Sequence, residues 1–245
     1  MKFRNITPAK FVVYYFYIIN EKAFLMIRLC IFDLDGTLSN TLQSLYSFCN
    51  TALRHCGFPL VEDLHKIQYM VGNGVHVLLE RLLTASLGDY TQAQYDQLFT
   101  AYNALYAADP LHLVTEYDGV RKVLHTLSKK GIQLAVLSNK PDDMTKRVVD
   151  TLYGEIPFAV RRGQRDGFPK KPAPDGLWAI LEELDCPKED CLYIGDSDVD
   201  IQTGRNSGVA TVGVTWGFRT PEELRAAGCT TLIDRPEQLL NLIGE

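Results

Sequence analysis

From residue 119 onward, the sequence alternates short apolar runs with longer stretches whose apolar residues recur at helical spacing. The runs have the length of buried strands, and the stretches between them have the length of helices. This alternation favours a parallel, doubly wound sheet of the α/β class, with helices on both faces. An earlier run, Arg28–Phe32, is the expected first strand. The later strands are expected at 132–137, 158–161, 191–194, 210–214 and 231–233.

A block that looks wholly helical, residues 39–118, interrupts the alternation after the first strand. Thr91 and Gln94 have the spacing of a capping box, which marks the start of a helix. We therefore expect an inserted helical cap domain at 39–118 and a core domain made of 26–38 and 119–245. Two apolar stripes at helical spacing support the cap: Val75, Leu78, Leu79, Leu82 and Leu83, then Tyr95, Leu98, Phe99, Tyr102 and Tyr106.

The first 25 residues do not fit this pattern. Their apolar run, Phe11–Ile19, is shorter than the ~20 residues that a helix needs to cross a bilayer, so stable membrane insertion is not expected. No small-residue cleavage site of a signal peptide follows it. Met26 is itself a plausible start, directly before the first expected strand. Three interpretations stay open for residues 1–25: a mis-called start, an extension packed on the body, or a targeting segment.

The composition narrows the possible partners. The chain has 245 residues with 30 acidic and 25 basic side chains, a net charge of −5, so nucleic-acid binding is not expected. A small anionic substrate needs only a few local cations and stays possible. The 6 cysteines form no CxxC pair, which favours reduced, mostly buried thiols of a cytoplasmic protein. The sequence does not determine the oligomeric state.

Polar side chains follow three of the expected strands or precede a helix. In open α/β sheets, ligands bind outside the carboxyl ends of the strands, so these side chains are expected to meet at one site. Their residue types are those of phosphate chemistry rather than of a nucleotide-binding loop, since neither GxxxxGK nor GxGxxG occurs. The candidates are Asp33, Asp35, Thr37, Ser138, Asn139, Lys171, Asp196 and Asp200.

The acidic candidates divide into nucleophile, proton donor and metal ligands. Asp33 can attack phosphorus and form an acyl phosphate, while Asp35 points to the other side of the extended backbone and can exchange protons. Mg²⁺ prefers oxygen ligands, and Asp33, the backbone carbonyl of Asp35 and Asp196 are the expected ones. Asp200 is expected to orient these groups, and Asp198 is a weaker candidate that we leave out.

The remaining candidates are expected to bind the transferring phosphoryl group. Ser138, the backbone of Asn139 and Lys171 would hold its oxygens, with Thr37 helping to position it. Lys170 is the neighbour of Lys171, but the Lys-Pro-x-Pro spacing favours Lys171. A bound Mg²⁺ together with Lys171 is expected to keep the nucleophile ionised by lowering its pKa.

These motifs resemble those of the haloacid dehalogenase-like hydrolase superfamily over about residues 26–245. The run 33–38, DLDGTL, resembles its first motif, Ser138 the second, Lys171 the third, and Gly195-Asp196 with Asp200 the fourth. The resemblance implies a Rossmann-like core, a helical cap between the first and second motifs, and Mg²⁺ as the cofactor. It also implies an enzyme whose second aspartate suits phosphatases and phosphomutases, because dehalogenases lack that residue.

Within the superfamily, the chain resembles the phosphoglycolate phosphatase group. The resemblance rests on Val71–Gly74 before a helix and on Val214–Phe218 after the last major strand. Arg81 either meets a substrate carboxylate or is a solvated helix residue. The preferred interpretation is a phosphatase acting on a small phosphorylated metabolite. A β-phosphoglucomutase-like phosphomutase and a non-catalytic phosphate-binding regulatory protein stay as alternatives.

Overall fold

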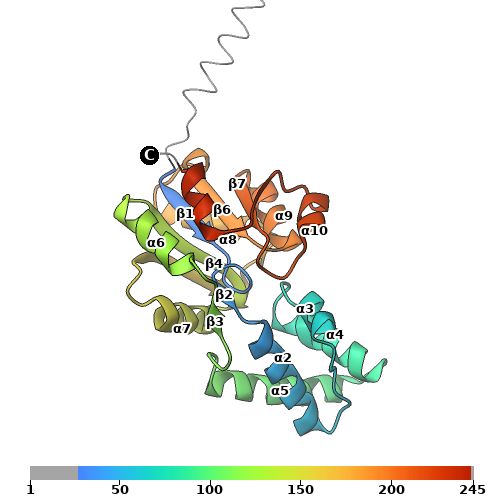
Figure 1. The fold of residues 1–245 in the computed structure, drawn as a ribbon. Coiled ribbons are helices and arrows are strands. Elements are labelled where there is room, and N and C mark those ends of the chain that lie inside the picture. Colours follow the sequence, from blue (N-terminus) through green and yellow to red (C-terminus); the bar gives the residue numbers. More distant parts are fainter. Residues whose placement is uncertain (1–26, 244–245) are drawn as a thin grey trace, which may run out of the picture.

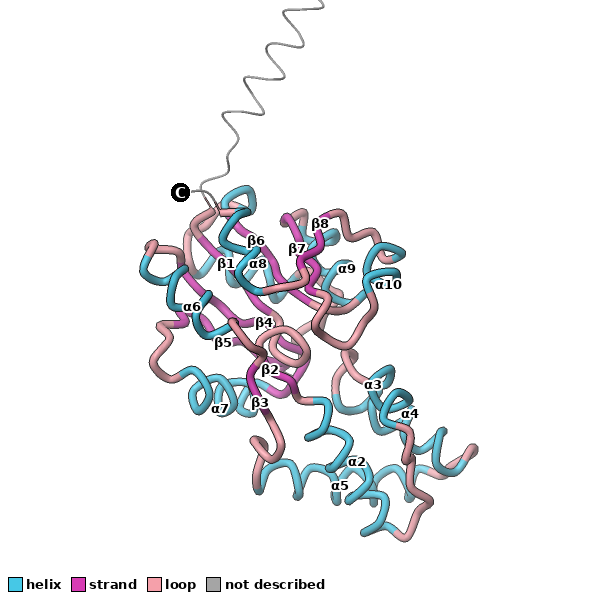
Figure 2. Tube along the Cα trace, viewed as in Figure 1, coloured by secondary structure: helices cyan, strands magenta, loops and turns pink. Residues whose placement is uncertain are grey.

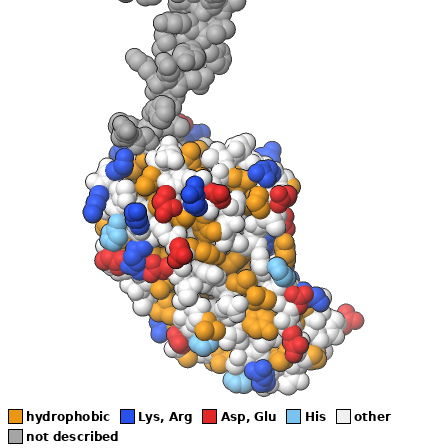
Figure 3. All heavy atoms as spheres, in the orientation of Figure 1, with side chains coloured by type: hydrophobic (Ala, Val, Ile, Leu, Met, Phe, Trp, Pro, Cys, Tyr) orange, Lys and Arg blue, Asp and Glu red, His pale blue; other side chains and the backbone are white. Residues whose placement is uncertain are grey.

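The computed structural model describes residues 27–243. The three interpretations of residues 1–25 therefore concern a segment outside the described residues. Among the described residues, no helix combines the length and apolar character that crossing a membrane requires. Figure 3 shows acidic and basic side chains mixed over the visible face rather than a continuous basic stripe. The 6 cysteines are free in the structure, and only Cys56 is not buried, which confirms that these side chains are mostly buried.

Six strands form one parallel sheet, as the alternating pattern predicts. The order across the sheet is β5-β4-β1-β6-β7-β8. From β1 the chain forms β4 and then β5 on one side, and it returns to form β6, β7 and β8 on the other side. The strand order therefore reverses beside β1, and a doubly wound sheet has its ligand crevice at such a point. The strands are β1 (Leu29–Phe32), β4 (Gln133–Pro141), β5 (Phe158–Gln164), β6 (Cys191–Gly195), β7 (Ala210–Val214) and β8 (Thr231–Ile233).

Helices cover both faces of the sheet (Figure 2), because the central strands are apolar on both sides. Cys30 and Phe32 of β1 belong to the core cluster that contains the buried residues of α6 and α7. Leu29 and Ile31 belong to the cluster under α8 on the other face. The remaining elements are α6 (Val120–Lys129), α7 (Asp142–Tyr153), α8 (Asp175–Glu183), α9 (Asp198–Ser207), α10 (Pro221–Ala226), η1 (Lys188–Asp190) and η2 (Pro236–Leu242).

Four helices form a separate body beside the carboxyl ends of the strands (Figure 1). They bury their own hydrophobic cluster, in which Leu78, Leu79, Leu82 and Leu83 of the predicted stripe are all buried. The capping box at Thr91 is also confirmed, since both of its reciprocal hydrogen bonds are present. These cap helices are α2 (Leu42–Cys56), α3 (Leu64–Met70), α4 (Val75–Leu87) and α5 (Gln92–Ala108).

The prediction that residues 39–118 are wholly helical is wrong at both ends. Two short strands, β2 (Ser39–Asn40) and β3 (Thr115–Glu116), pair antiparallel where the chain enters and leaves the cap. The two crossings lie side by side, so their backbone groups satisfy each other by hydrogen bonding. The division of the chain at residues 38/39 and 118/119 stays a prediction, and the two separate cores are consistent with it.

Strand β4 continues beyond the predicted end at residue 137. It reaches Pro141, whose register partner on β5 is Gln164. The strand includes Ser138, Asn139 and Lys140, which are all buried, and its register with β5 shifts between Leu137 and Pro141. The second group of polar candidates thus lies at the carboxyl end of β4, the neighbour of β1 in the sheet.

Candidate active site

A cavity of about 790 Å³, including its open mouth, lies between the carboxyl end of β1 and the cap. It is the place where the reversal of strand order predicts a ligand. The core supplies its charged side chains and the cap supplies uncharged ones. The core residues are Asp33, Asp35, Ser138, Asn139, Lys140, Pro141, Lys171, Asp196, Ser197, Phe218 and Arg219; those of the cap are Leu45, Val71, Gly72, Gly74, Val75, Leu78, Tyr102, Asn103 and Tyr106.

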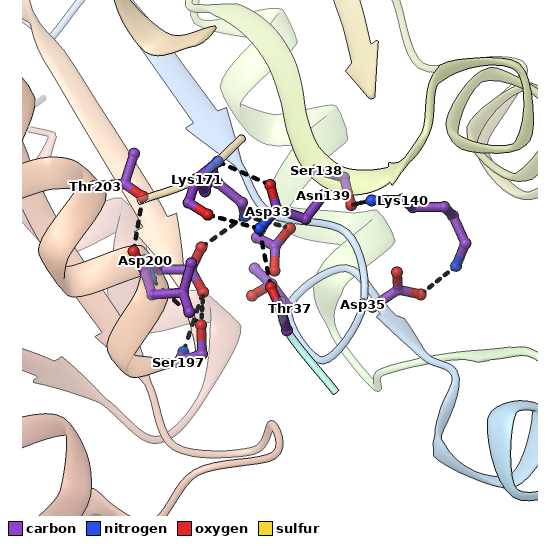
Figure 4. Close-up of polar contacts among 12 residues, drawn as sticks. Asp33, Asp35, Thr37, Ser138, Asn139, Lys140, Lys171, Ser197, Asp200 and Thr203 are labelled. Carbon is purple, nitrogen blue, oxygen red and sulfur yellow. Dashed lines mark hydrogen bonds and ion pairs between the residues drawn. The ribbon is translucent and has the colours of Figure 1, made fainter. Parts of the chain in front are cut away.

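Asp33 follows the last residue of β1 and faces Lys171 (Figure 4). The Lys171 ammonium lies 2.8 Å from an oxygen of Asp33 and 2.8 Å from an oxygen of Asp200. All three side chains are buried. One cation therefore joins the carboxylates that follow two neighbouring strands, β1 and β6, across the crevice. Lys171, which the Lys-Pro-x-Pro spacing favoured, lies in this site, whereas Lys170 is exposed and donates to the Asn73 carbonyl.

Burial raises the pKa of Asp33 to about 7, and the charge on Asp200 adds to the increase. Lys171 acts in the opposite direction, both by its charge and by its hydrogen bond. The prediction of a low pKa for Asp33 depended on a bound Mg²⁺ as well as on Lys171. Without that cation, desolvation outweighs the lysine, because a buried carboxylate loses the hydration that favours its charged form.

Asp35 is held by a different cation. Its carboxylate accepts a hydrogen bond from the ammonium of Lys140 at 2.5 Å, and both side chains are largely buried. Burial alone would lower the pKa of Lys140, but the charge of Asp35 and the hydrogen bonds with Asp35 and Tyr106 raise it above its usual value. The ring of Tyr106 on the cap lies 5.5 Å from the same ammonium. The two aspartates of the first motif thus have separate lysine partners.

Asp200 is fully buried and all its hydrogen bonds in the site are made within the core. One oxygen accepts from Lys171 at 2.8 Å and from the Tyr193 hydroxyl at 2.6 Å. The other accepts from the hydroxyl of Ser197 at 2.6 Å and from its backbone N–H at 3.1 Å. Burial raises the pKa of Asp200, but Lys171, Ser197 and Tyr193 together bring it below its ordinary value. Asp200 therefore stays ionised and fixes Lys171.

Asp196 lies in a tight pocket made of backbone. Its Oδ1 accepts from the Thr37 hydroxyl at 2.9 Å, and its Oδ2 accepts from the Phe218 N–H at 2.8 Å. A Cβ added at Gly36 or at Gly217 would lie 2.3 Å from an atom of the Asp196 side chain. Only glycine therefore fits at these two positions. Thr37, predicted to help bind phosphate, has its hydroxyl on Asp196 and is not among the residues that line the cavity.

Three buried carboxylates have the arrangement of a metal site. One oxygen each of Asp33, Asp196 and Asp200 lies within 4.8 Å of the others. Burial, followed by the charges of Asp200 and Asp33, raises the pKa of Asp196 well above its ordinary value. A divalent cation would compensate this excess of negative charge, and an all-oxygen donor set suits a hard cation. Since Asp200 already accepts four hydrogen bonds, Asp33 and Asp196 have more capacity left for an ion.

Asn139 has a structural role that the sequence analysis missed. Its side-chain N–H groups donate to the carbonyl of Lys171 at 3.0 Å and to that of Gly72 on the cap at 2.9 Å. Its side-chain oxygen accepts from the Lys171 N–H at 2.9 Å. The side chain of Asn139 thus fixes the loop that carries Lys171, and the predicted contact of its backbone with the phosphoryl group stays a prediction. Ser138 lines the cavity, and its hydroxyl accepts from the Lys140 N–H at 3.3 Å.

The arginine that lines the cavity is Arg219 rather than Arg81. Arg81 donates to the carbonyl of Met70 at 3.0 Å and is not among the lining residues. Arg219 donates to the backbone carbonyls of Gln68 and Val71 of the cap, at 3.2 and 3.0 Å. It also lies 3.5 Å from Asp198, the half-exposed carboxylate left out of the predicted site. Arg219 directly follows Val214–Phe218, the segment that resembles the phosphoglycolate phosphatase group. This neighbouring segment was the signal in the sequence that could have indicated Arg219.

The chain matches the family model for haloacid dehalogenase-like hydrolases over residues 30–214. It is 33% identical over 224 residues to a phosphoglycolate phosphatase of Vibrio vulnificus (strain YJ016), covering 89% of this chain and 96% of the relative. A Pseudomonas putida phosphoglycolate phosphatase is 31% identical over 217 residues, or 87% and 78% of the two chains. A crystal structure from Lactobacillus delbrueckii subsp. bulgaricus, of a protein with predicted phosphoglycolate phosphatase activity, has a TM-score of 0.81 and 31% identity. That match covers 89% of this chain and 99% of the other.

The parallel sheet, the helical cap and the paired aspartates after β1 define a hydrolase of the α/β class. With the family match over residues 30–214, the chain belongs to the haloacid dehalogenase-like hydrolases. Its similarity to curated relatives and to solved structures places it in the phosphoglycolate phosphatase-like group, and its class is that of the phosphatases. This confirms the resemblance inferred from the four motifs.

Proposed function

We propose that this protein is a Mg²⁺-dependent phosphatase that hydrolyses a small phosphorylated metabolite, of the phosphoglycolate type, through an aspartyl phosphate on Asp33. The observation that carries the proposal is the separation of the two aspartates. Asp33 pairs with Lys171 at 2.8 Å, whereas Asp35, two residues later, pairs with Lys140 at 2.5 Å. A nucleophile and a proton carrier need separate partners, because one must be ionised when it attacks while the other must gain and lose a proton.

In the first step, a carboxylate oxygen of Asp33 attacks phosphorus as the bond to the leaving oxygen breaks. Asp35 gives its proton to that leaving oxygen, and the alcohol departs. Lys171 and Ser138 hold oxygens of the transferring phosphoryl group, whose charge is spread over three oxygens. In the second step, Asp35 takes a proton from water, and the water oxygen attacks the phosphorus of the aspartyl phosphate. Inorganic phosphate leaves, and Asp33 is restored.

Asp33, Asp196 and the backbone carbonyl of Asp35 are the proposed protein ligands of Mg²⁺. When bound, the ion supplies positive charge that offsets the negative charge of the phosphoryl oxygens. Asp200 contributes by positioning Lys171, and Thr37 contributes by positioning Asp196 through their 2.9 Å hydrogen bond. Lys171 and Thr37, the donors to Asp200 and Asp196, are both buried, so the site needs little reorganisation during the reaction.

A phosphate-release screen over about a hundred phosphorylated metabolites, with Mg²⁺ and including phosphoglycolate, tests the substrate class. The names of the curated relatives support phosphoglycolate or a similar compound as the best substrate. Stoichiometric release of inorganic phosphate from such a compound is the expected result. An isomerised sugar phosphate without free phosphate would favour a phosphomutase, and binding without turnover would favour a regulatory protein.

A further inference from the structure

Three cationic side chains line the cavity in the part of the chain that the structure describes: Lys140, Lys171 and Arg219. Two of them already have fixed roles. Lys171 lies between Asp33 and Asp200. Arg219 uses its guanidinium to hold two carbonyls of the cap and lies 3.5 Å from Asp198. A negative charge on the part of the substrate that leaves would therefore have Lys140 as its candidate partner.

Lys140 lies where that part of the substrate must be. Its ammonium is 2.5 Å from an oxygen of Asp35, the proposed proton donor to the leaving oxygen. A substituent one carbon beyond the leaving oxygen would extend past Asp35, away from Asp33 and Lys171. Figure 4 shows Lys140 and Asp35 together on the side of the site away from Lys171. Lys140 is thus within reach of a group next to the phosphate ester.

The cap does not supply a competing charge. The cap residues that line the cavity are all uncharged, and the ring of Tyr106 lies 5.5 Å from the Lys140 ammonium. In the described residues, the anionic partner of Lys140 is Asp35, the very group that must exchange a proton during the proposed reaction. A ligand that offers another anion to Lys140 would release Asp35 from this ion pair.

We propose that Lys140 determines substrate specificity by binding a carboxylate next to the phosphate ester, and that this carboxylate replaces Asp35 as the partner of the lysine. The inference rests on the proposed function and deepens it. An ester with an uncharged end leaves Asp35 paired with Lys140, whereas an ester with a carboxylate end frees Asp35 to reach the leaving oxygen. Binding of the substrate carboxylate to Lys140 would then both select an acidic substrate and release Asp35 for proton transfer.

The test compares 2-phosphoglycolate with 2-hydroxyethyl phosphate in the presence of Mg²⁺. Both esters have a primary alcohol as the leaving group, so a general loss of Asp35 function affects them alike and cancels in the ratio of their kcat/KM values. The wild-type enzyme should prefer the acid. In Lys140→Met this ratio should fall roughly 10- to 100-fold, since a hydrogen bond to a charged group of the substrate is lost. Lys146→Met, which removes an exposed lysine paired with Asp142, should keep the wild-type ratio.

An unchanged ratio in a folded Lys140→Met protein would overturn the inference, even if both rates fell. Lys140→Gln, which keeps a donor for Asp35, provides a second variant if the methionine variant does not fold. If the wild-type enzyme hydrolyses neither ester, the proposed substrate class fails, and binding still tests Lys140. Calorimetry on Asp33→Asn should then show tighter binding of 2-phosphoglycolate than of 2-hydroxyethyl phosphate, and adding Lys140→Met should abolish the difference. Equal binding of the two ligands before that change would contradict the inference.

Discussion

The backbone N–H of Phe218 donates a 2.8 Å hydrogen bond to Oδ2 of Asp196, while the Phe218 ring is buried in the hydrophobic cluster of the cap. One residue thus contacts both a candidate metal ligand and the body that covers the cavity. Gln68 of the cap also donates to the Phe218 carbonyl at 2.5 Å. The position of the cap and the orientation of Asp196 are therefore physically connected.

Replacing Gly217, the residue before Phe218, should weaken metal binding. In Gly217→Ala, the added Cβ would lie 2.3 Å from the Cβ of Asp196, so the carboxylate must move. We expect a loss of roughly 10- to 100-fold in Mg²⁺ affinity, the size typical of changes to the residues that orient metal ligands. Calorimetric titration with Mg²⁺ measures it. Gly88→Ala is the control: it strains a positive φ but meets no neighbour, so it should lower stability and leave Mg²⁺ affinity unchanged. Wild-type affinity in Gly217→Ala would contradict the assignment.

The cap is expected to close when a phosphoryl analogue binds. It joins the core through the β2 and β3 crossings, and closure would exclude water from the site. Tetrafluoroaluminate with Mg²⁺ should therefore slow amide hydrogen exchange at 38–40 and 115–119 and reduce the radius of gyration in X-ray scattering. Asp33→Asn, which lacks the proposed nucleophile, should show a smaller response. An unchanged exchange pattern and radius in the wild-type protein would argue against a lid.

Stability without metal should fall as the pH rises from about 5 to about 8. Asp33 has a pKa raised from 3.8 to about 7, so the folded chain binds a proton that the unfolded chain has already lost. Its contribution to stability is full below the unfolded value and is lost as the pH rises through about 7. The melting temperature of EDTA-treated protein should decrease over this interval, and Asp33→Asn should show a shallower decrease. Mg²⁺ must displace the proton, so it should raise the melting temperature more at pH 8 than at pH 5.5. Equal slopes in the two proteins would contradict the raised pKa.

The sequence predicted most of the fold because its signals are local. The six strands could be located from apolar runs, and the structure brings Asp33, Lys171 and Asp200, which were all expected at the strand ends, into contact. The contacts that were missed join segments far apart in the chain. Lys140 and Asp35 are 105 residues apart, and no periodicity links them. They meet only because pairing with β5 extends β4 past its apolar run.

The cap contacts were missed for a related reason. The stripe that contains Tyr106 predicted a buried helix face, which is correct, but helical spacing does not indicate that a lysine of the core lies over the ring. Phe218 was noted only as part of a segment resembling the family. Its double contact depends on how the cap is seated on the core, and a linear pattern carries no information about that.

Acid-quenched mass spectrometry of Asp35→Asn distinguishes the role of Asp33 as nucleophile from that of Asp35 as proton carrier. This variant keeps the backbone carbonyl of residue 35 and the shape of the side chain but removes proton transfer, which should cost roughly 10²–10⁴-fold in turnover. p-Nitrophenyl phosphate has a leaving group that needs little protonation, so the first step should still occur. The intermediate should then accumulate, because water is no longer deprotonated.

After digestion of the quenched Asp35→Asn protein, we expect one added phosphoryl group on the peptide that contains Asp33, with the modification on that residue. Asp33→Asn should show neither this modification nor turnover. Phosphate on another residue, or normal turnover by Asp33→Asn, would contradict the account.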